Sequence, residues 1–402
     1  MNVKPIITSL LEDDLYKFTM WQAMLHAYPA ATGEYRFVCR NDTAFPLGEL
    51  VDQVNAQLDH LCTLRFKEDE LAYLSGLRYI KSDFIDFLYL FQFRRRFIEA
   101  VDDNGTLVIL ARGPLIHVMD FEIRVLSIVN ELYFTELERR TGISGVEEGN
   151  KRLDARIEKI KAIDGQPSRR FPFEFFDFGL RRRYSGDWQR QVATRLSKEV
   201  PEHFRGTSNV LLARDLGITP IGTMAHEFLA LHQAVGVRLV DFQKAALQAW
   251  VSEFRGDLGT ALTDIVGMDA FLRDFDLYFA KLFDGMRHDS GDPYVWGEKA
   301  LRHYHAFNID PATKRFTFSD GLDVDSAIQL WHCFGDRIKT GFGIGTKLMN
   351  DYGPKPLNIV MKLVQCNGSP VAKLSDSPGK TLCDDETYVR YLADVFNTRV
   401  ML

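Results

Sequence analysis

The 402-residue sequence has few cysteines and no long apolar run. Its five cysteines are odd in number, scattered and without a Cys-x-x-Cys pair. This argues against a disulfide framework or a thiolate zinc site and predicts a reducing compartment. No apolar run approaches the ~20 residues that cross a bilayer, and residues 1–11 lack the apolar stretch of a signal peptide. The sequence therefore predicts a cytoplasmic protein without a membrane partner.

An excess of positive charge is also absent. Lysine and arginine number 49 against 55 aspartates and glutamates, for a net charge of −6. The basic triplet at residues 94–96 is interpreted as a solvated face. This charge balance excludes a general polyanion binder and predicts no nucleic-acid partner. The length, at ~150 residues per domain, indicates two or three domains.

The N-terminal third combines helical and strand-like patterns. Residues 12–26 carry apolar side chains at near-helical spacing, and residues 35–38 form a short strand candidate. Residues 82–97 are rich in phenylalanine and leucine and are interpreted as a buried helix or helix pair. Asn104 and Gly105 lie between two β-prone runs and predict a hairpin turn, because Asn-Gly tolerates positive φ.

From Ser144 onward a regular alternation begins. Ser144 and Glu147 match a capping box that opens a charged helix through Lys161. Short apolar strands follow, each ending in a polar or glycine cluster and each followed by a helical pattern. Seven such units are typical of a β/α barrel, whose strand ends meet at one mouth and carry the chemistry. The clusters are residues 175–179, 206–209, 222–226, 262–264, 286–290, 318–321 and 341–346.

The C-terminal stretch returns to strand-like runs at residues 357–364 and 370–374 and ends in a helical pattern. We therefore expect an α/β protein, with an irregular β/α barrel plus a smaller α+β domain built from the N-terminal region and the C-terminal return. The expected boundaries are residues 136–354 for the catalytic barrel, and residues 1–135 with 355–402 for the discontinuous α+β domain.

Two neighbouring strand ends have the composition of a phosphate site. Residues 343–347 read Gly-Ile-Gly-Thr-Lys, and residues 319–321 read Ser-Asp-Gly. Glycine next to Ser or Thr at a strand-to-helix junction offers backbone N–H groups and hydroxyls to a phosphate. A single cluster of this kind is equally typical of a tight turn without a ligand. Two clusters in successive units favour phosphate binding.

Charged residues gather at other strand ends. Residues 287–292 read Arg-His-Asp-Ser-Gly-Asp, where carboxylates can hold Mg²⁺ or ribose hydroxyls and arginine can bind an anion. A solvated turn with local ion pairs is the alternative, and Asp264 could join the acidic set. His226 could be a general base, a metal ligand, a nucleophile or a structural histidine. Zinc is disfavoured because the next histidine, His232, does not share its helix face.

One strand end joins an aromatic residue to a basic run. Phe178 is followed by three arginines at residues 181–183. An aromatic face with arginine suits a flat ligand that carries negative charge. A core phenylalanine beside solvated arginines would explain the same pattern equally well.

Taken together, these motifs resemble the nicotinate phosphoribosyltransferase family of type II phosphoribosyltransferases. They occur in the family's order and span nearly the whole chain. Two positions depart from the family pattern: Leu180 and Ile265 stand where threonine is common. The matching stretches are residues 13–20, 177–179 with 181–182, 206–210, 222–223 with 225–227, 263–264, 287 with 289–293, 319–322 and 342–346.

The resemblance implies that nicotinate and phosphoribosyl pyrophosphate give nicotinate mononucleotide and pyrophosphate in NAD biosynthesis, coupled to hydrolysis of ATP. It implies transient phosphorylation of His226, with ATP as co-substrate and Mg²⁺ as cofactor. Asp264 and Asp289 would serve ribose hydroxyls and Mg²⁺. The other implied contacts are Tyr16 and Phe178 around the pyridine ring, Arg181 and Arg287 on anionic groups, Ser319, Asp320, Gly345 and Thr346 on the 5′-phosphate, and Arg40 near the phosphates.

Ser208 bears on the choice of base. Nicotinamide-using relatives carry aspartate at the matching position, which repels a carboxylate, whereas serine can donate a hydrogen bond to one. We therefore favour nicotinate over three alternatives: a nicotinamide or a quinolinate phosphoribosyltransferase, or a non-catalytic nucleotide-binding barrel. We also expect a homodimer with a shared active site, because Tyr16 and Arg40 reach the barrel mouth most easily from a neighbouring chain.

Overall fold

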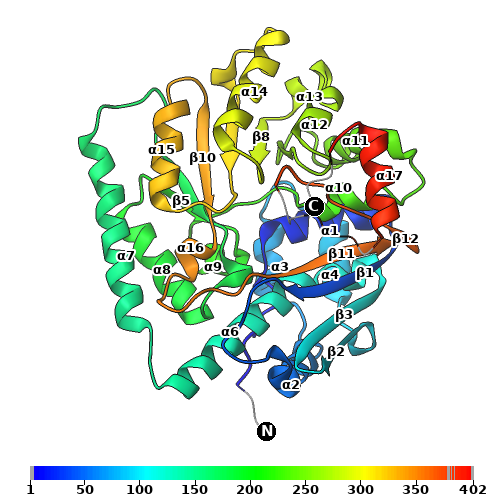
Figure 1. Cartoon of the computed structure of the whole chain (residues 1–402), viewed down its shortest axis with the longest axis vertical. Coiled ribbons are helices and arrows are strands. Elements are labelled where there is room, and N and C mark those ends of the chain that lie inside the picture. Colours follow the sequence, from blue (N-terminus) through cyan, green and yellow to red (C-terminus); the bar gives the residue numbers. More distant parts are fainter. Residues whose placement is uncertain (1–3, 378–380, 382, 384, 400–402) are drawn as a thin grey trace.

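The protein is built on two β-sheets of different kinds. The computed structural model describes residues 4–377, 381, 383 and 385–399. Within them one sheet has seven strands and the other five. Figure 1 shows helices packed around the parallel strands, with the antiparallel sheet beside them. Among the described residues, no helix combines the length and the hydropathy that a membrane span needs.

The larger sheet carries the predicted strand ends. Its strands run in the order β6-β5-β4-β10-β9-β8-β7, and every neighbouring pair is parallel. The sheet is curled into an incomplete barrel, which confirms the expected irregular β/α barrel. The strands are β4 (Phe175–Asp177), β5 (Phe204–Thr207), β6 (Thr219–Pro220), β7 (Thr260–Leu262), β8 (Gly285–His288), β9 (Arg315–Phe318) and β10 (Lys339–Ile344).

The sheet is open between its two edge strands, where helix α1 (Leu15–Ala27) lies. The Thr19 hydroxyl donates a hydrogen bond of 2.7 Å to the backbone oxygen of Thr223. A Cβ atom on Gly222 would lie only 3.0 Å from the backbone nitrogen of Tyr16, so glycine permits this approach. The N-terminal helix thereby reaches the mouth of the barrel within its own chain.

The barrel helices follow the strands as the alternation predicts. Helix α14, for example, starts where the Asp292 carboxylate accepts hydrogen bonds from the Tyr294 and Val295 nitrogens, with Pro293 in the first turn. The helices are α8 (Gly186–Glu199), α9 (Val210–Leu216), α10 (His226–Leu231), α11 (Phe242–Phe254), α12 (Met268–Asp274), α13 (Leu277–Leu282), α14 (Pro293–Ala306), α15 (Val324–Phe334) and α16 (Thr346–Met349), with 3-10 turns η4 (Leu180–Arg182), η5 (Leu239–Asp241) and η6 (Pro311–Thr313).

The smaller sheet joins the two ends of the chain. Its order is β12-β11-β1-β3-β2, and all of its pairs are antiparallel. The C-terminal strand β11 lies beside the N-terminal strand β1, in orange and blue in Figure 1. The predicted C-terminal return is therefore present. The strands are β1 (Thr32–Cys39), β2 (Ile98–Asp103), β3 (Thr106–Pro114), β11 (Ile359–Cys366) and β12 (Ser369–Pro370).

The N-terminal elements match the predicted helix, strand and hairpin. The turn between β2 and β3 holds Asn104 at φ 52° and Gly105 at φ 88°, as a hairpin turn with two positive φ angles requires. The remaining helices are α2 (Val51–Leu61), α3 (Glu68–Ser75), α4 (Ser82–Leu90), α5 (Leu115–Val118), α6 (Phe121–Thr141), α7 (Val146–Lys161) and α17 (Glu386–Phe396), with 3-10 turns η1 (Leu47–Leu50), η2 (Arg95–Phe97) and η3 (Ala162–Gly165).

Three local predictions are wrong. The helix or helix pair expected over residues 82–97 is present only as α4 and the short turn η2, and Leu90 at the end of α4 is 77% exposed, so this stretch is not one buried helical unit. Helix α7 ends at Lys161 as predicted, but its N-cap is Gly145 without a side-chain cap, so Ser144 forms no capping box. Only Ser369–Pro370 pairs as β12, and most of residues 370–374 crosses the barrel mouth as a loop because its N–H groups bond to side chains and loops there.

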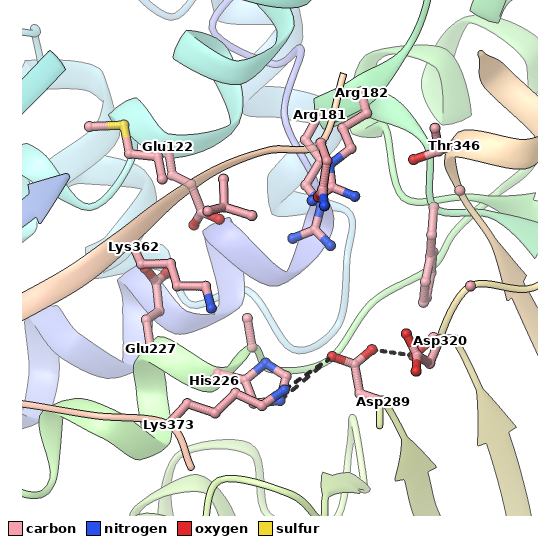
Figure 2. Close-up of a pocket in the computed structure, with 18 of the residues that line it drawn as sticks. Glu122, Arg181, Arg182, His226, Glu227, Asp289, Asp320, Thr346, Lys362 and Lys373 are labelled. Atoms are coloured by element: carbon pink, nitrogen blue, oxygen red, sulfur yellow. Dashed lines mark hydrogen bonds and ion pairs between the residues drawn. The ribbon is translucent and has the colours of Figure 1, made fainter. Parts of the chain in front are cut away.

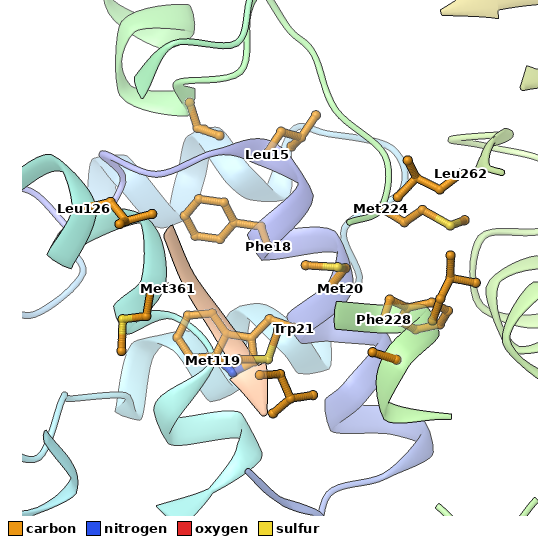
Figure 3. Packing of buried hydrophobic residues seen from close by; sticks show 14 of the residues in the cluster. Leu15, Phe18, Met20, Trp21, Met119, Leu126, Met224, Phe228, Leu262 and Met361 are labelled. Carbon is orange, nitrogen blue, oxygen red and sulfur yellow. The ribbon is translucent and has the colours of Figure 1, made fainter. Parts of the chain in front are cut away.

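A continuous hydrophobic core connects the two sheets through α1. Figure 3 shows Phe18, Met20 and Trp21 of this helix between residues of α6 and β11 on one side and the barrel on the other. Trp21 is fully buried, and its ring centroid lies 4.5 Å from that of Phe91. Because α1 is part of this core, the residues at its N-terminus hold a fixed position relative to the barrel.

Candidate active site

A cavity of about 680 Å³ opens where the barrel mouth faces the antiparallel sheet. Its wall combines strand-end loops of the barrel with residues of β11 and of the C-terminal return. The structure therefore brings most of the sequence-predicted residues together in one place. Those that line the cavity are Arg40, Phe178, Arg181, His226, Arg287, Asp289, Ser319, Asp320, Gly345 and Thr346.

Three predicted residues lie behind this wall. Asp264 is 1% exposed and reaches the cavity only through its hydrogen bonds. Ser208 is 2% exposed, and its backbone oxygen accepts a hydrogen bond of 2.8 Å from Leu15. The Tyr16 hydroxyl is also buried. These residues support or adjoin the cavity and do not form its surface.

His226 is the first residue of α10 and faces two carboxylates. Its Nε2 lies 2.8 Å from Oδ1 of Asp264 and 3.6 Å from Oδ2 of Asp289. Burial lowers the pKa of His226, the Lys373 ammonium lowers it further, and Asp264 acts in the opposite direction. The neutral imidazole therefore predominates, with Nε2 directed at Asp264.

Asp264 is held by three donors. Besides His226, the Ser290 hydroxyl donates to its Oδ2 at 2.6 Å, and Lys373 Nζ lies 2.6 Å from the same oxygen. Burial raises the pKa of Asp264, but Lys373 and His226 outweigh it and hold the pKa well below its usual value. Asp264 is therefore an anion with both carboxylate oxygens engaged.

Asp289 lies between His226 and Arg287, the arginine of β8. The Ser319 hydroxyl donates to its Oδ1 at 2.8 Å, and Arg287 Nη2 lies 3.4 Å from the same atom. Burial raises its pKa, but Arg287 and Lys373 lower it below the usual range. Figure 2 shows Asp289 directed into the cavity between His226 and Asp320. Ligand atoms of His226, Asp264 and Asp289 all lie within 4.8 Å of one another.

The opposite wall is cationic. Figure 2 shows Arg181, Arg182 and Lys362 across the cavity from Asp289. Burial lowers the pKa of Lys362 to about 7, and its neighbours Arg40 and Lys373 lower it in the same direction. Burial and the neighbouring Arg181 lower the pKa of Arg182 to about 9. Cations gathered at this density indicate a site for a polyanion.

An acidic pair completes the cavity beside α1. Glu122 and Glu227 line it, and each places a carboxylate oxygen 2.6 Å from Nζ of the buried Lys17. Burial raises the pKa of Glu227 to about 7, and Lys17 counteracts this shift. The pair fixes the start of α10 against α1 and so helps to position His226.

Phe178 lies on the cavity wall because of a glycine. A Cβ atom on Gly343 would be 2.4 Å from the Phe178 ring, so only glycine leaves room for it. The guanidinium of Arg287 lies 5.5 Å from the ring centroid. Arg181 and Arg182 also line the cavity, whereas Arg183 is buried against Glu12. This arrangement favours the flat anionic ligand over a core phenylalanine with solvated arginines.

Comparison with known proteins agrees with this geometry. Residues 11–130 match the model of the nicotinate phosphoribosyltransferase N-terminal domain, and residues 173–400 match the model of the nicotinate phosphoribosyltransferase family. A nicotinate phosphoribosyltransferase of Chromobacterium violaceum is 61% identical over 394 residues, which are 98% of this chain and 97% of that protein. The chain belongs to the nicotinate phosphoribosyltransferase family.

Further members of the family support this assignment. The nicotinate phosphoribosyltransferase of Herminiimonas arsenicoxydans is 60% identical, with 98% of each chain covered. The crystal structure of nicotinate phosphoribosyltransferase from Vibrio cholerae superposes with a TM-score of 0.92 at 37% identity, covering 98% of this chain and 94% of that one. The family resemblance inferred from short motifs is therefore confirmed over nearly the whole chain.

Two lysines that line the cavity were not among the residues predicted from the sequence. Lys362 stands in the apolar run of β11, and Lys373 stands between Ala372 and Leu374. A single lysine in an otherwise apolar run is a signal that could have found both, since a buried lysine needs an anionic partner.

The structure also bears on the reason for expecting a shared active site. Arg40 lines the cavity of its own chain, and α1 brings Tyr16 to the same barrel mouth. Arg40 therefore lies at the cavity of its own chain, and Tyr16 lies behind the wall of that cavity. The homodimer with a shared active site stays a prediction.

Proposed function

We propose that this protein transfers the phosphoribosyl group of phosphoribosyl pyrophosphate to nicotinate in NAD biosynthesis. The products are nicotinate mononucleotide and pyrophosphate. The observation that carries the proposal is the cavity itself, whose wall combines the aromatic ring of Phe178 and a group of cations with the carboxylates of Asp289 and Asp320. It supports a reaction that joins a flat anionic base to a polyanionic sugar phosphate.

The base is oriented by side chains at one end of the cavity. Phe178 offers a ring face and Arg181 supplies positive charge for the base carboxylate. The second ring face is assigned to Tyr16 at the start of α1, which interacts electrostatically with Arg181. The ring nitrogen of nicotinate has a free lone pair, so its bond to ribose C1 forms as the C1–O bond to pyrophosphate breaks. Orientation at C1 then replaces general-base catalysis.

The leaving group and the phosphate are held by opposite walls. Arg40, Arg182 and Lys362 stabilise the charge that develops on pyrophosphate. The 5′-phosphate is assigned to the two glycine-containing strand ends, whose backbone N–H groups and hydroxyls suit it. These strand ends contribute Ser319, Asp320, Gly345 and Thr346 to the cavity wall.

Magnesium would bind at Asp289 in this proposal. Carboxylate oxygens are the ligands that Mg²⁺ prefers, and Asp289 faces the cavity beside Asp320. Asp264 fits a direct ligand poorly, because both of its oxygens already accept hydrogen bonds or an ion pair. The ion would supply charge to the pyrophosphate group, while Asp264 positions His226 and Lys373.

Coupling to ATP is assigned to His226. Its Nε2–H donates to Asp264, so Nδ1 carries the lone pair of the neutral imidazole. Nδ1 attacks the γ-phosphorus of ATP, the N–P bond forms, and the bond to the ADP oxygen breaks. Water later cleaves the N–P bond and releases phosphate. Asp264 stabilises the imidazole through both steps.

The proposed function is tested by assaying purified protein with each base, with and without ATP. We expect nicotinate mononucleotide from nicotinate, a higher rate with ATP, and little product from nicotinamide or quinolinate. Label from γ-labelled ATP should appear as phosphohistidine and disappear in His226→Ala but not in the control His305→Ala, an exposed position. Equal use of nicotinamide would contradict the proposed choice of nicotinate as the base. No label on the protein and no gain in rate with ATP would contradict the proposed coupling through His226.

Two further proposals concern the molecule in the cell. Cys39, Cys62, Cys333 and Cys366 form no disulfide in the structure, which supports the proposed cytoplasmic location. The homodimer is tested by sedimentation of the active enzyme. Full specific activity in a dilute monomer would contradict it.

A further inference from the structure

Asp14 occupies the N-cap position of α1 but does not cap the helix. Its backbone is extended, at φ −72° and ψ 136°, as an N-cap residue requires, yet its side chain accepts no hydrogen bond from the helix. Aspartate is among the residues that cap helices best, so this position gives up a stabilising contact. Helix capping therefore does not explain why an aspartate side chain is buried at this position.

Three buried polar atoms near this helix end lack partners. Oδ1 of Asp14, the Tyr16 hydroxyl and the Ser208 hydroxyl each have no hydrogen bond to any described residue. Asp14 is 3% exposed and Ser208 is 2% exposed. Because buried polar atoms need hydrogen-bond partners, a ligand that reached this place would meet three polar groups able to bind it.

The three residues form one subsite beside the cavity. Leu15 N–H donates to the Ser208 oxygen at 2.8 Å, and Asp14 forms a β-bridge with Asn209, so the two segments are tied together. The Ser208 hydroxyl lies near enough to Asp14 to stabilise its carboxylate. The Arg181 guanidinium lines the cavity and interacts electrostatically with Tyr16, Asp289 and Asp14. Arg181 therefore connects this subsite to the reacting centre.

We propose that Asp14 is a specificity-determining residue, whose carboxyl group contacts the ring substituent of the pyridine base together with Ser208. The inference rests on the proposed function and deepens it. Protonated Asp14 donates an O–H hydrogen bond to the carboxylate of nicotinate, Ser208 donates a second, and Arg181 balances the negative charge. Ionised Asp14 repels that carboxylate but accepts a hydrogen bond from the amide of nicotinamide.

The protonation of Asp14 makes this selectivity depend on pH. Burial raises its pKa to about 7, and Ser208 counteracts that shift. The uncharged form thus predominates below neutrality and is lost as the pH rises through this value. The charged and titratable groups that face Asp14 are Asp13 in its own loop, Tyr16 on α1, Asp177 at the end of β4, Arg181 in η4 and, through its hydroxyl, Ser208 after β5.

The test compares the wild type with Asp14→Asn between pH 6 and 8.5. In the wild type, kcat/KM for nicotinate should fall by up to tenfold per pH unit above about pH 7, while kcat/KM for nicotinamide does not fall with it. In Asp14→Asn the side-chain amide donates at every pH, so the nicotinate profile should lose this alkaline limb. Nicotinate binding should take up a proton in the wild type near pH 7.5 and not in the variant.

Asp274→Asn is the matched control. Like Asp14, Asp274 has a raised pKa, but it is only partly buried, lies outside the cavity and accepts a hydrogen bond from Gln243. This variant should keep the wild-type profile. An Asp14→Asn enzyme with the wild-type pH profile and base preference would overturn the inference, as would an equal loss for both bases at every pH. A wild type that makes no nicotinate mononucleotide would instead overturn the proposed function.

Discussion

At the scale of single residues, Lys373 sets the charge balance around His226. It lies 2.6 Å from Asp264 and 3.8 Å from Asp289, and it lowers the pKa of the histidine. Replacing it by methionine should raise that pKa, because two carboxylates would then stabilise the imidazolium without a competing cation. The neutral nucleophile, which exists above the pKa, would become scarcer near neutrality.

We therefore expect Lys373→Met to lower ATP-coupled activity at least about tenfold, or ~1.4 kcal/mol, and to move the acid limb of the pH–rate profile to higher pH. The profile and the yield of phosphohistidine are the measurements. Lys373→Arg keeps the charge and should recover part of both, and Lys244→Met at an exposed site serves as control. An acid limb that stays in place would show that Lys373 does not tune His226.

A second prediction concerns the room for Phe178. Gly343→Ala would place its Cβ atom 2.4 Å from the ring and force the ring to move. An aromatic contact of this type contributes ~0.5–1.5 kcal/mol, so KM for nicotinate should rise roughly threefold to tenfold. Gly165→Ala is the control, since its added Cβ meets no atom within 4 Å. Equal KM values in both variants would remove Phe178 from the base site.

The sequence could predict the reactive residues of this site but not all of their neighbours. His226, Asp289 and Arg287 stand in polar clusters at strand ends, where barrel chemistry gathers, so position and residue type agree. Lys362 and Lys373 stand in apolar runs, and their direction depends on how the C-terminal return pairs with β1. That pairing joins residues more than 300 positions apart, such as Arg36 and Lys362, which no local pattern encodes.

At the scale of elements, residues 371–377 of the C-terminal return, called the strap below, cross the ends of β7 and β8. Leu374 N–H donates to Ile265 O at 2.8 Å, and Asp376 accepts from the Met268 nitrogen at 3.0 Å. The strap carries Lys373, so its attachment determines where that ammonium lies.

Asp376 makes the attachment pH-dependent. Burial, with the charge of Asp264, raises its pKa from 3.8 to about 6. A raised pKa in the folded state means that the group contributes stability at low pH, which is lost as the pH rises from about 4 to 6. Relative to Asp376→Asn, the wild type should therefore lose up to ~3 kcal/mol of unfolding free energy over this range.

Urea denaturation of both proteins at pH 4.5 and 7.5 measures this difference. Asparagine keeps an oxygen for the Met268 N–H, so the variant tests the charge and not the hydrogen bond. Asp325→Asn on the exposed face of α15 should show no comparable change. A stability difference that is the same at both pH values would mean that Asp376 does not titrate in this range.

Elements were predictable where a local signal decides them. The Asn104-Gly105 hairpin and the alternation of strands and helices follow from turn chemistry and apolar periodicity. The capping box at Ser144 was wrong because Gly145 takes the N-cap, where a Cβ atom would collide with Tyr352 from a distant loop. Packing against that loop, which the local sequence does not contain, decides where α7 begins.

At the scale of the whole molecule, the net charge of −6 hides a cationic cavity wall. Burial lowers the pKa values of Lys362 and Arg182, and the neighbouring cations lower them further, so these cations repel one another in the free protein. A polyanion would relieve this repulsion. The repulsion between these cations therefore lowers the stability of the free protein and raises its affinity for a polyanion, a trade-off that is common at binding sites.

Lys362→Met separates the two effects. Removing one of the mutually repelling cations should raise the Tm of the free protein by a few degrees, on the order of 1 kcal/mol. The same variant should lose most of the Tm increase that inorganic pyrophosphate gives the wild type, since that increase follows affinity. Lys355→Met, at an exposed position outside the cavity, should change neither value. The prediction would be contradicted if the Lys362→Met protein had a lower Tm than the wild type and kept the full Tm increase with pyrophosphate. Lys362 would then stabilise the fold and would not bind the leaving group.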